Sequence, residues 1–163
     1  MHPAPRVIED NLVSAWRVAT DEVEPVFVPA PIFADDRGWS ITNQLQGVLS
    51  AEGQVNYSVL YPGVVKAWHR HRLQTDFWLG VDGHLKVGIH RQEDGHTWMA
   101  VVGEKRPGVL IIPPPLWHGA TVAGPTSAAL FYYVTHAYNH AAPDEERRPH
   151  DSVTDFDWGM SHR

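Results

Sequence analysis

Two histidines and an aspartate lie close together near the middle of this chain, at a spacing that suits either a metal ion or a proton-transfer site. The stretch WHRHRLQTD places His69 and His71 two residues apart, with Asp76 five residues further on. A third histidine, His118, follows the proline-rich segment IPPPLW. Three imidazoles and one carboxylate can hold a divalent transition metal with open positions for substrate, whereas one neutral imidazole can act as a general base. The residue types leave both chemistries open.

These side chains can meet only if the segments that carry them are extended. Side chains two residues apart in a strand point to the same face, so His69 and His71 are expected to share one. The chain shows short apolar stretches separated by turn residues about every eight to twelve residues, which is typical of an all-β sandwich or barrel. The predicted strands are 26–28, 39–44, 54–61, 64–69, 76–81, 84–90, 97–102, 108–112, 120–122 and 128–135. One short helix is predicted around residues 9–17, where Ile8, Leu12 and Trp16 recur at helical spacing.

Length and composition narrow the class of protein. A chain of 163 residues is about one domain, and a formal charge of −6 without a long basic run excludes a phosphate-binding surface for nucleic acid. The absence of cysteine excludes disulfides and thiolate chemistry and fits a cytoplasmic location. The start, MHPAPRVIED, lacks a signal-peptide pattern, and the longest apolar run, 108–117, contains three prolines. We therefore expect a cytoplasmic protein that does not span a membrane.

The motif order resembles the cupin superfamily. The first motif reads G-x5-H-x-H-x4-D-x6-G from Gly63 to Gly83, and the second reads P-x-P-x2-H up to His118. The resemblance implies a double-stranded β-helix, or jelly-roll, barrel, which agrees with the all-β prediction. On this basis we expect a single cupin domain over residues 1–163, with an N-terminal arm (1–31), a barrel (32–136) and a C-terminal segment packed on the barrel through Phe156 and Trp158 (137–163).

Within the cupins, the chain is similar to the dTDP-4-dehydrorhamnose 3,5-epimerase-like family. The segments that carry this similarity are FADDRGWS, NYSVLYPGVVKAWH, GHLKVGIH, IPPPLWHG and VTHAYNHAAPDEER, in that order. The resemblance implies an epimerase that inverts carbon 3 and/or carbon 5 of a dTDP-4-keto-6-deoxy sugar without a cofactor. It also implies a homodimer, and we expect the N-terminal arm to pair with the sheet of the neighbouring subunit.

The same resemblance implies roles for individual residues. His69 is expected to be the base that removes a proton next to the 4-keto group, with Asp151 as its partner and Tyr138 or Tyr132 as the acid on the opposite face. Arg37 of the DDRG turn is expected to reach the diphosphate across the dimer interface. The other predicted substrate-binding residues are Lys66, His118, Trp68 and Asn56.

One departure from the family pattern keeps the metal hypothesis open. Asp76 stands where the family has a lysine that supports the enolate, and an aspartate cannot stabilise a neighbouring oxyanion. His69, His71, Asp76 and His118 together form a complete ligand set for one divalent transition metal. The alternative is therefore a metal-dependent cupin acting as a dioxygenase or isomerase, or a sugar-binding cupin without catalysis. The charged run 145–148 is interpreted as a solvated surface.

Overall fold

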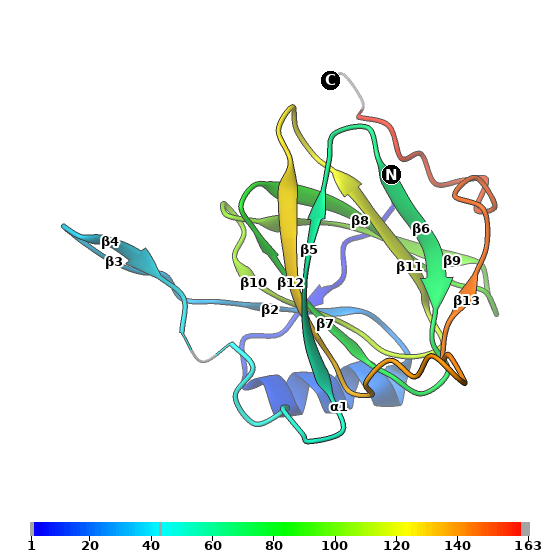
Figure 1. The fold of residues 1–163 in the computed structure, drawn as a ribbon, viewed down its shortest axis with the longest axis horizontal. Coiled ribbons are helices and arrows are strands. Elements are labelled where there is room, and N and C mark those ends of the chain that lie inside the picture. Colours follow the sequence, from blue (N-terminus) through cyan, green and yellow to red (C-terminus); the bar gives the residue numbers. More distant parts are fainter. Residues whose placement is uncertain (1, 43, 161–163) are drawn as a thin grey trace.

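Two β-sheets face each other, and a smaller two-stranded sheet lies outside them (Figure 1). The computed structural model describes residues 2–42 and 44–160 of the chain. The larger sheet has six strands in the order β1-β2-β10-β7-β12-β5. These strands are β1 (Arg6–Val7), β2 (Val26–Pro29), β10 (Gly108–Ile112), β7 (Asp76–Val81), β12 (Ala128–Val134) and β5 (Gln54–Leu60).

The second sheet has five strands in the order β13-β6-β11-β8-β9, all antiparallel to their neighbours. These strands are β13 (Glu146–Arg147), β6 (Val65–Arg70), β11 (Trp117–Val122), β8 (His84–Arg91) and β9 (His96–Gly103). The predicted all-β architecture is confirmed.

Apolar side chains fill the space between the sheets at one end. Leu85, Val87 and Ile89 alternate along β8, and all three are fully buried. They belong to the same core cluster as Leu110 and Leu130 of the larger sheet. Burying one such aliphatic side chain contributes about 1.5–3 kcal/mol relative to leaving it exposed, so this layer holds the two sheets together.

The α-helix α1 (Leu12–Glu22) covers the outer side of the larger sheet. The side chain of Asn11 caps its first turn by accepting a backbone hydrogen bond. Its buried residues Leu12, Ala15 and Ala19 pack in one cluster with strands of that sheet. A helix was predicted here over residues 9–17, but the observed one begins later, after the Asn11 cap, and ends later, because Ala19 extends the buried face beyond Trp16.

The N-terminal segment differs from the predicted arm. Strands β1 and β2 pair with each other, and β2 pairs with β10 of the same chain. The reason is that Val26 and Phe27 are both buried in the core, so this segment is part of the larger sheet. The barrel therefore starts before residue 32, and β1 and β2 do not form a free arm for a neighbouring subunit.

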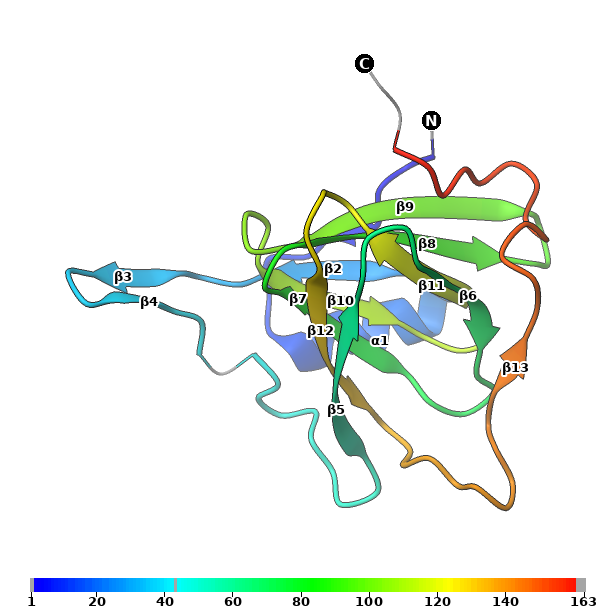
Figure 2. The same ribbon diagram turned by 45° about the horizontal axis from the view of Figure 1, so that its top comes forward.

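The segment predicted as a strand over 39–44 is also different. Only its beginning is extended, as β4 (Gly38–Ser40), which pairs with β3 (Phe33–Asp35) in a hairpin. Figures 1 and 2 both show this hairpin projecting away from the two main sheets. All its side chains are exposed, and in the described part of the chain no further strand pairs with it. Residues 41, 42 and 44 are not strand, and Asn43 lies outside the described residues.

The C-terminal segment crosses the outer face of the five-stranded sheet, as predicted. Phe156 and Trp158 form an apolar cluster with Trp68, Trp117 and Val153. The last residues, 161–163, which were expected to be free, lie outside the described part of the chain.

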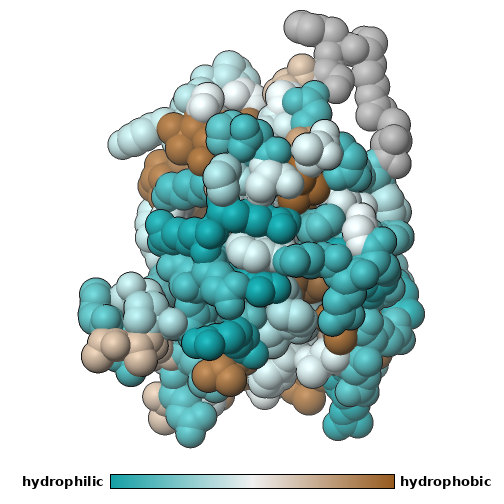
Figure 3. Space-filling view, turned by 90° about the vertical axis from the view of Figure 1, so that its right-hand side faces the viewer, coloured by the Kyte–Doolittle hydropathy of each residue, from teal (hydrophilic) through white to brown (hydrophobic). Residues whose placement is uncertain are grey.

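Hydrophilic side chains cover most of the face that carries β13 and this segment (Figure 3). Within residues 2–42 and 44–160, no helix is both long enough and apolar enough to cross a membrane.

Candidate active site

Strands β6, β7 and β11 bring four polar side chains together between the two main sheets. His69 in β6 and His118 in β11 are direct partners in an antiparallel pairing, and their ring centroids are 4.2 Å apart. His71 follows β6, and Asp76 is the first residue of β7 in the other sheet. One potential ligand atom from each of the four lies within 4.8 Å of the others. The residues that the sequence singled out for chemistry therefore converge on one point.

Hydrogen bonds of two of these histidines determine which ring nitrogen stays free. His118 Nδ1 lies 2.9 Å from the carbonyl oxygen of Leu116, and His71 Nδ1 lies 2.5 Å from that of Asp144. A carbonyl oxygen only accepts, so each Nδ1 donates, and in the neutral ring Nε2 is the nitrogen that keeps a lone pair. Among the described residues, His118 Nε2 has no hydrogen-bond partner; it lies 3.5 Å from Oδ2 of Asp76.

Asp76 is a buried carboxylate that accepts two side-chain hydrogen bonds. Its Oδ1 accepts a hydrogen bond from Gln74 Nε2 (2.7 Å), and its Oδ2 accepts one from Trp78 Nε1 (2.9 Å). Burial alone would raise the pKa of Asp76, but the contacts with His118 and the other two histidines outweigh burial and lower this pKa to about 2. Asp76 is therefore negatively charged at neutral pH.

The imidazoles of His69 and His71 are uncharged at neutral pH. Burial, with a further contribution from His118, lowers the pKa of His69 well below its usual 6.5, although Asp76 acts in the opposite direction. Burial likewise lowers the pKa of His71. Neutral imidazoles are the form required both for a general base and for a metal ligand.

A cavity of about 760 Å³ opens in front of this cluster. His69 of the five-stranded sheet lines one side of it, and Asp76 of β7, Asn56 of β5 and Tyr132 of β12 line it from the larger sheet. Its volume is within the usual range for small-molecule sites, and its lining combines apolar walls with a few polar groups. The arrangement can place a ligand between an imidazole on one sheet and a phenol on the other.

Several other predicted residues are also in the cavity wall. Asn56, Lys66, Tyr132 and Tyr138 all line it, and the ammonium of Lys66 donates to the hydroxyl of Ser58 at 3.0 Å. Burial raises the pKa of Tyr132, and Asp76 and Glu145 raise it further, so the phenol stays protonated at neutral pH.

Two predicted substrate-binding residues have different surroundings from those expected. His118 is only 2 % exposed and is not among the described residues that line the cavity, so it contacts His69 rather than a ligand. Trp68 borders the cavity, but its indole packs in the outer apolar cluster and donates to the carbonyl of His150 at 2.9 Å. Successive residues of β6 face opposite sides, which explains why Trp68 and His69 separate.

Two further predicted site residues, Arg37 and Asp151, are not among the described residues that line the cavity of their own chain. Arg37 lies in the β3–β4 hairpin, with its side chain 85 % exposed and paired with Asp35. Asp151, predicted as the partner of His69, is exposed in a turn after β13 and is not among the described residues that line the cavity. Asp76 is instead the carboxylate nearest the histidines, because β7 places it directly beside them.

Sequence reasoning missed the contribution of the segment just before and within β13. Glu145, Arg147 and Arg148 line the cavity, and Arg147 is the direct partner of His69 in the pairing of β13 with β6. The charged run was interpreted as solvated surface, and the structure shows that it also forms one wall of the site. The sequence feature that could have indicated this role is the position of the charged run shortly after the VTHAYNH segment.

Comparisons with known proteins agree with this fold. No protein-family model matches the sequence. The chain is 37 % identical over 138 residues to the spore coat polysaccharide biosynthesis protein SpsL of Bacillus subtilis (strain 168), covering 80 % of this chain and 91 % of that protein. It is 40 % identical over 101 residues to the probable low-salt glycan biosynthesis epimerase Agl13 of Haloferax volcanii, covering 58 % of this chain and 65 % of that protein.

Solved structures show the same fold. A dTDP sugar isomerase from Desulfovibrio desulfuricans G20 superposes with a TM-score of 0.73 over 85 % of this chain and 92 % of that one, at 22 % sequence identity. The jelly-roll prediction is thus confirmed. The identity and coverage shared with SpsL exceed what a common fold alone would give. The chain therefore belongs to the same family as SpsL, within the dTDP-4-dehydrorhamnose 3,5-epimerase-like cupins.

Proposed function

We propose that this protein is a nucleotide-sugar epimerase that inverts carbon 3 and/or carbon 5 of a dTDP-4-keto-6-deoxy sugar. The observation that carries the proposal is that a neutral, half-buried His69 and a protonated Tyr132, one on each sheet, line the same cavity. Family membership supports it, since the relatives named above act in polysaccharide or glycan biosynthesis by their names.

The proton transfers follow from this geometry. Carbons 3 and 5 are both α to the 4-keto group, so their C–H bonds are acidified by the carbonyl. His69 takes the proton, the C–H electron pair forms the carbon–carbon double bond of an enolate, and the carbonyl oxygen becomes the oxyanion. Tyr132 then donates its hydroxyl proton to the same carbon from the other face, which inverts the centre. Tyr138, which also lines the cavity and is about half exposed, is the second candidate for this acid.

Positive charge must offset the enolate, because Asp76 beside the base is negative. Lys66 and Arg147 are cationic residues in the cavity wall. The guanidinium of Arg147 bonds to Glu145 through Nε at 2.9 Å and Nη2 at 3.1 Å, which fixes its orientation. In the proposed complex Arg147, the strand partner of His69, offsets the enolate charge and Lys66 holds the sugar diphosphate, and no cofactor is needed. The cytoplasmic location stays a prediction from composition.

We also infer a homodimer. Strand β5 is an edge of the larger sheet, and its outward side chains Val55, Tyr57 and Val59 are exposed. Uncovered apolar side chains on an edge strand favour contact with another chain. The projecting β3–β4 hairpin carries exposed Phe33 and Trp39 and can lie on such a surface in a second copy. In that dimer, Arg37 would act in the partner's cavity, as the resemblance implies.

A second candidate function is metal-dependent, and one observation favours it. When the imidazole of His118 is neutral, its Nε2 points a lone pair at the carboxylate of Asp76 at 3.5 Å, which is repulsive unless a proton or a metal ion lies between the two atoms. His69, His71, Asp76 and His118 fit a divalent transition metal in number and donor type. When bound, such an ion would supply positive charge beside a substrate oxygen. His69 would then be a ligand and not a free base.

Two measurements test the main proposal against this second candidate. The purified protein is incubated in D₂O with a dTDP-4-keto-6-deoxy sugar, and product stereochemistry and mass are followed. We expect inverted product carrying one or two deuterium atoms. Elemental analysis of the same protein separates the candidates: about one transition metal per chain, with activity lost on chelation, favours the metal-dependent reading. Tight binding of the nucleotide sugar without exchange would indicate a sugar-binding cupin and overturn both.

A further inference from the structure

Asp144 lies in the chain immediately before the cavity wall formed by β13, and its carboxylate binds the loop that follows β6. Its two oxygens accept backbone hydrogen bonds from Arg72 (3.1 Å), Leu73 (2.9 Å) and Gln74 (3.2 Å). These three residues belong to no strand or helix, so their N–H groups have no ladder partner. A single carboxylate therefore satisfies three consecutive donors of this loop.

The main chain of Asp144 makes a second contact with the same loop. Its carbonyl oxygen accepts from His71 Nδ1 at 2.5 Å. This bond selects the tautomer in which Nε2 keeps the lone pair, and it orients the ring toward the cluster. The side chain and the carbonyl of one residue thus hold both the ring of His71 and the backbone that follows it.

The other end of the loop is connected to Asp76. The backbone N–H of Gln74 binds Asp144, and the amide of the same Gln74 side chain donates to Oδ1 of Asp76 at 2.7 Å. Asp144 therefore acts on two members of the cluster, His71 directly and Asp76 through Gln74. It is not among the described residues that line the cavity, so it does not touch a ligand there.

The negative charge and the burial of Asp144 strengthen the hydrogen bonds that its carboxylate accepts from the loop. The side chain of Asp144 is only 17 % exposed, and hydrogen bonds from a carboxylate to N–H groups are stronger than neutral ones. Burial would raise the pKa of Asp144, but the three backbone donors lower it below its usual value, so it stays ionised at neutral pH. The ion pair with Arg72, at 3.6 Å with a mostly exposed guanidinium, adds little.

We propose that Asp144 is a positioning residue of the active site, fixing the loop from His71 to Asp76 in the geometry that the reaction needs; this role rests on the proposed function. The C-terminal segment thereby completes a site whose other residues come from the middle of the chain. Asp144 and the loop are about seventy residues apart in sequence, and it is this long-range contact that sets the positions of His71 and Asp76.

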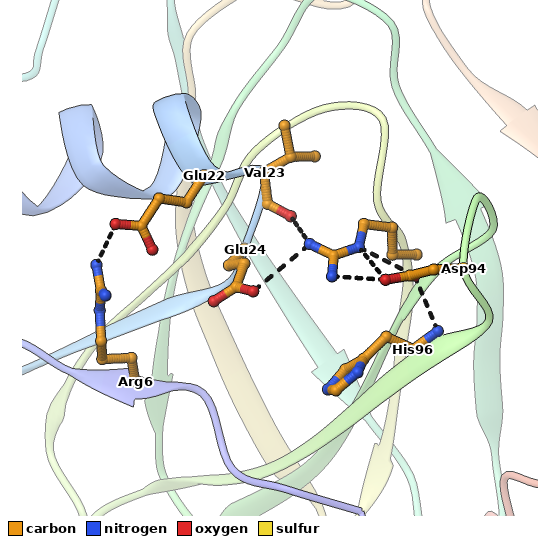
Figure 4. Close-up of polar contacts among 7 residues, drawn as sticks. Arg6, Glu22, Val23, Glu24, Asp94 and His96 are labelled. Carbon is orange, nitrogen blue, oxygen red and sulfur yellow. Dashed lines mark hydrogen bonds and ion pairs between the residues drawn. The ribbon is translucent and has the colours of Figure 1, made fainter.

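The test compares Asp144→Asn with a matched control, Asp94→Asn. Asp94 also accepts a backbone hydrogen bond, from His96 at 3.1 Å, and pairs with Arg91 at 2.8 Å, but in the turn between β8 and β9 (Figure 4). It is not among the described residues that line the cavity. For Asp144→Asn we expect kcat to fall about 10–100-fold with little change in KM, and for Asp94→Asn neither should change.

Two spectroscopic readouts do not depend on activity. In the wild type, the amides of residues 72–74 should exchange slowly with D₂O, and ¹⁵N NMR should show His71 as a single Nδ1–H tautomer. In Asp144→Asn, the three amides should exchange faster and the tautomers should mix. Fast exchange of these amides in the wild type overturns the proposal even if the variant fails to fold.

The kinetic outcome is separable from the proposed function. A variant in which kcat falls no more than in the Asp94 control, while the amides lose protection, shows that the loop is held for stability alone and overturns the positioning role. A wild type without any epimerase activity overturns the proposed function instead, and the amide exchange and His71 spectrum then decide whether Asp144 holds the loop.

Discussion

His118 Nε2 lies 3.5 Å from Oδ2 of Asp76, and both side chains are almost fully buried. The Nδ1 atom of this histidine is engaged with the carbonyl of Leu116, and Asp76 already accepts two hydrogen bonds. The pair therefore needs a positive charge between or beside its two facing atoms, supplied by a proton or by a metal ion. Which of the two Asp76 receives, a proton on His118 or a metal ion, distinguishes the two candidate functions.

Replacing Asp76 by asparagine should destabilise the fold. The amide group that asparagine introduces is a donor and would face the N–H of Gln74 or Trp78, leaving a buried donor unsatisfied at a cost of about 1–3 kcal/mol. Urea denaturation at pH 7 measures this loss, with exposed Asp36→Asn as control. Equal stability of Asp76→Asn and the wild type would contradict the hydrogen-bonding assigned to Asp76.

The stability contributed by Asp76 should also depend on pH. Its pKa is about 2 in the folded state and 3.8 without these contacts, so folding favours the ionised form. The corresponding stabilisation, about 2 kcal/mol, is fully present above roughly pH 4 and is lost as the pH falls toward 2. The stability difference between wild type and Asp76→Asn should therefore shrink in acid. A difference that is constant from pH 7 to pH 3 would contradict the lowered pKa.

The pH dependence of catalysis should reflect the lowered pKa of His69. Because burial keeps this imidazole neutral well below pH 6.5, the base form persists in mildly acidic solution. The acid limb of the kcat/KM profile is therefore expected well below pH 6.5. An acid limb at or above that pH would show that another group, or a protonated His69, controls the reaction.

Tyr132→Phe should separate proton removal from inversion. Without the phenol, reprotonation from the opposite face should slow by about 10²-fold or more, while His69 continues to exchange the substrate proton with solvent. The measurement compares inverted product with deuterium incorporation in the unchanged isomer. Tyr138→Phe is the matched control; if that variant loses inversion and Tyr132→Phe keeps it, Tyr138 is the acid.

The two cations proposed to reach the diphosphate, Lys66 and Arg37, should affect substrate binding more than turnover. Lys66→Ala should raise KM by about 10-fold or more with little change in kcat, because a hydrogen bond to a charged group is lost. Arg37→Ala should do the same only in a dimer, whereas Arg17→Ala on the exposed side of α1 should not. Sedimentation analysis gives the oligomeric state. A monomer in which Arg37→Ala still raises KM would contradict the proposed interface.

Local patterns were sufficient to predict most of the strands of the two main sheets and the cluster. His69 and His71 have the two-residue spacing of one strand face, and His118 follows a proline-rich turn before a strand, so the motif order was enough to place them together. Leu85, Val87 and Ile89 show why the strands were predictable: their alternation matches their burial.

Long-range contacts explain what the sequence did not reveal. Asp144 and Arg147 lie in a charged, proline-flanked segment that has the composition of a solvated surface, and only the pairing of β13 with β6 brings it to the cavity. Asp151 was chosen by position in a resembling motif, and the turn after β13 leaves it exposed. The two-residue strand β1 was too short to show any periodicity.

The central claim is tested most directly by the role of His69 in proton exchange. Wild type, His69→Ala and the exposed-surface control His96→Ala are incubated in D₂O with a dTDP-4-keto-6-deoxy sugar, and deuterium at carbons 3 and 5 is followed by NMR. We predict exchange by the wild type and the control, and a rate about 10²–10⁴-fold lower for His69→Ala. Undiminished exchange by His69→Ala would contradict the assignment of His69 as the base.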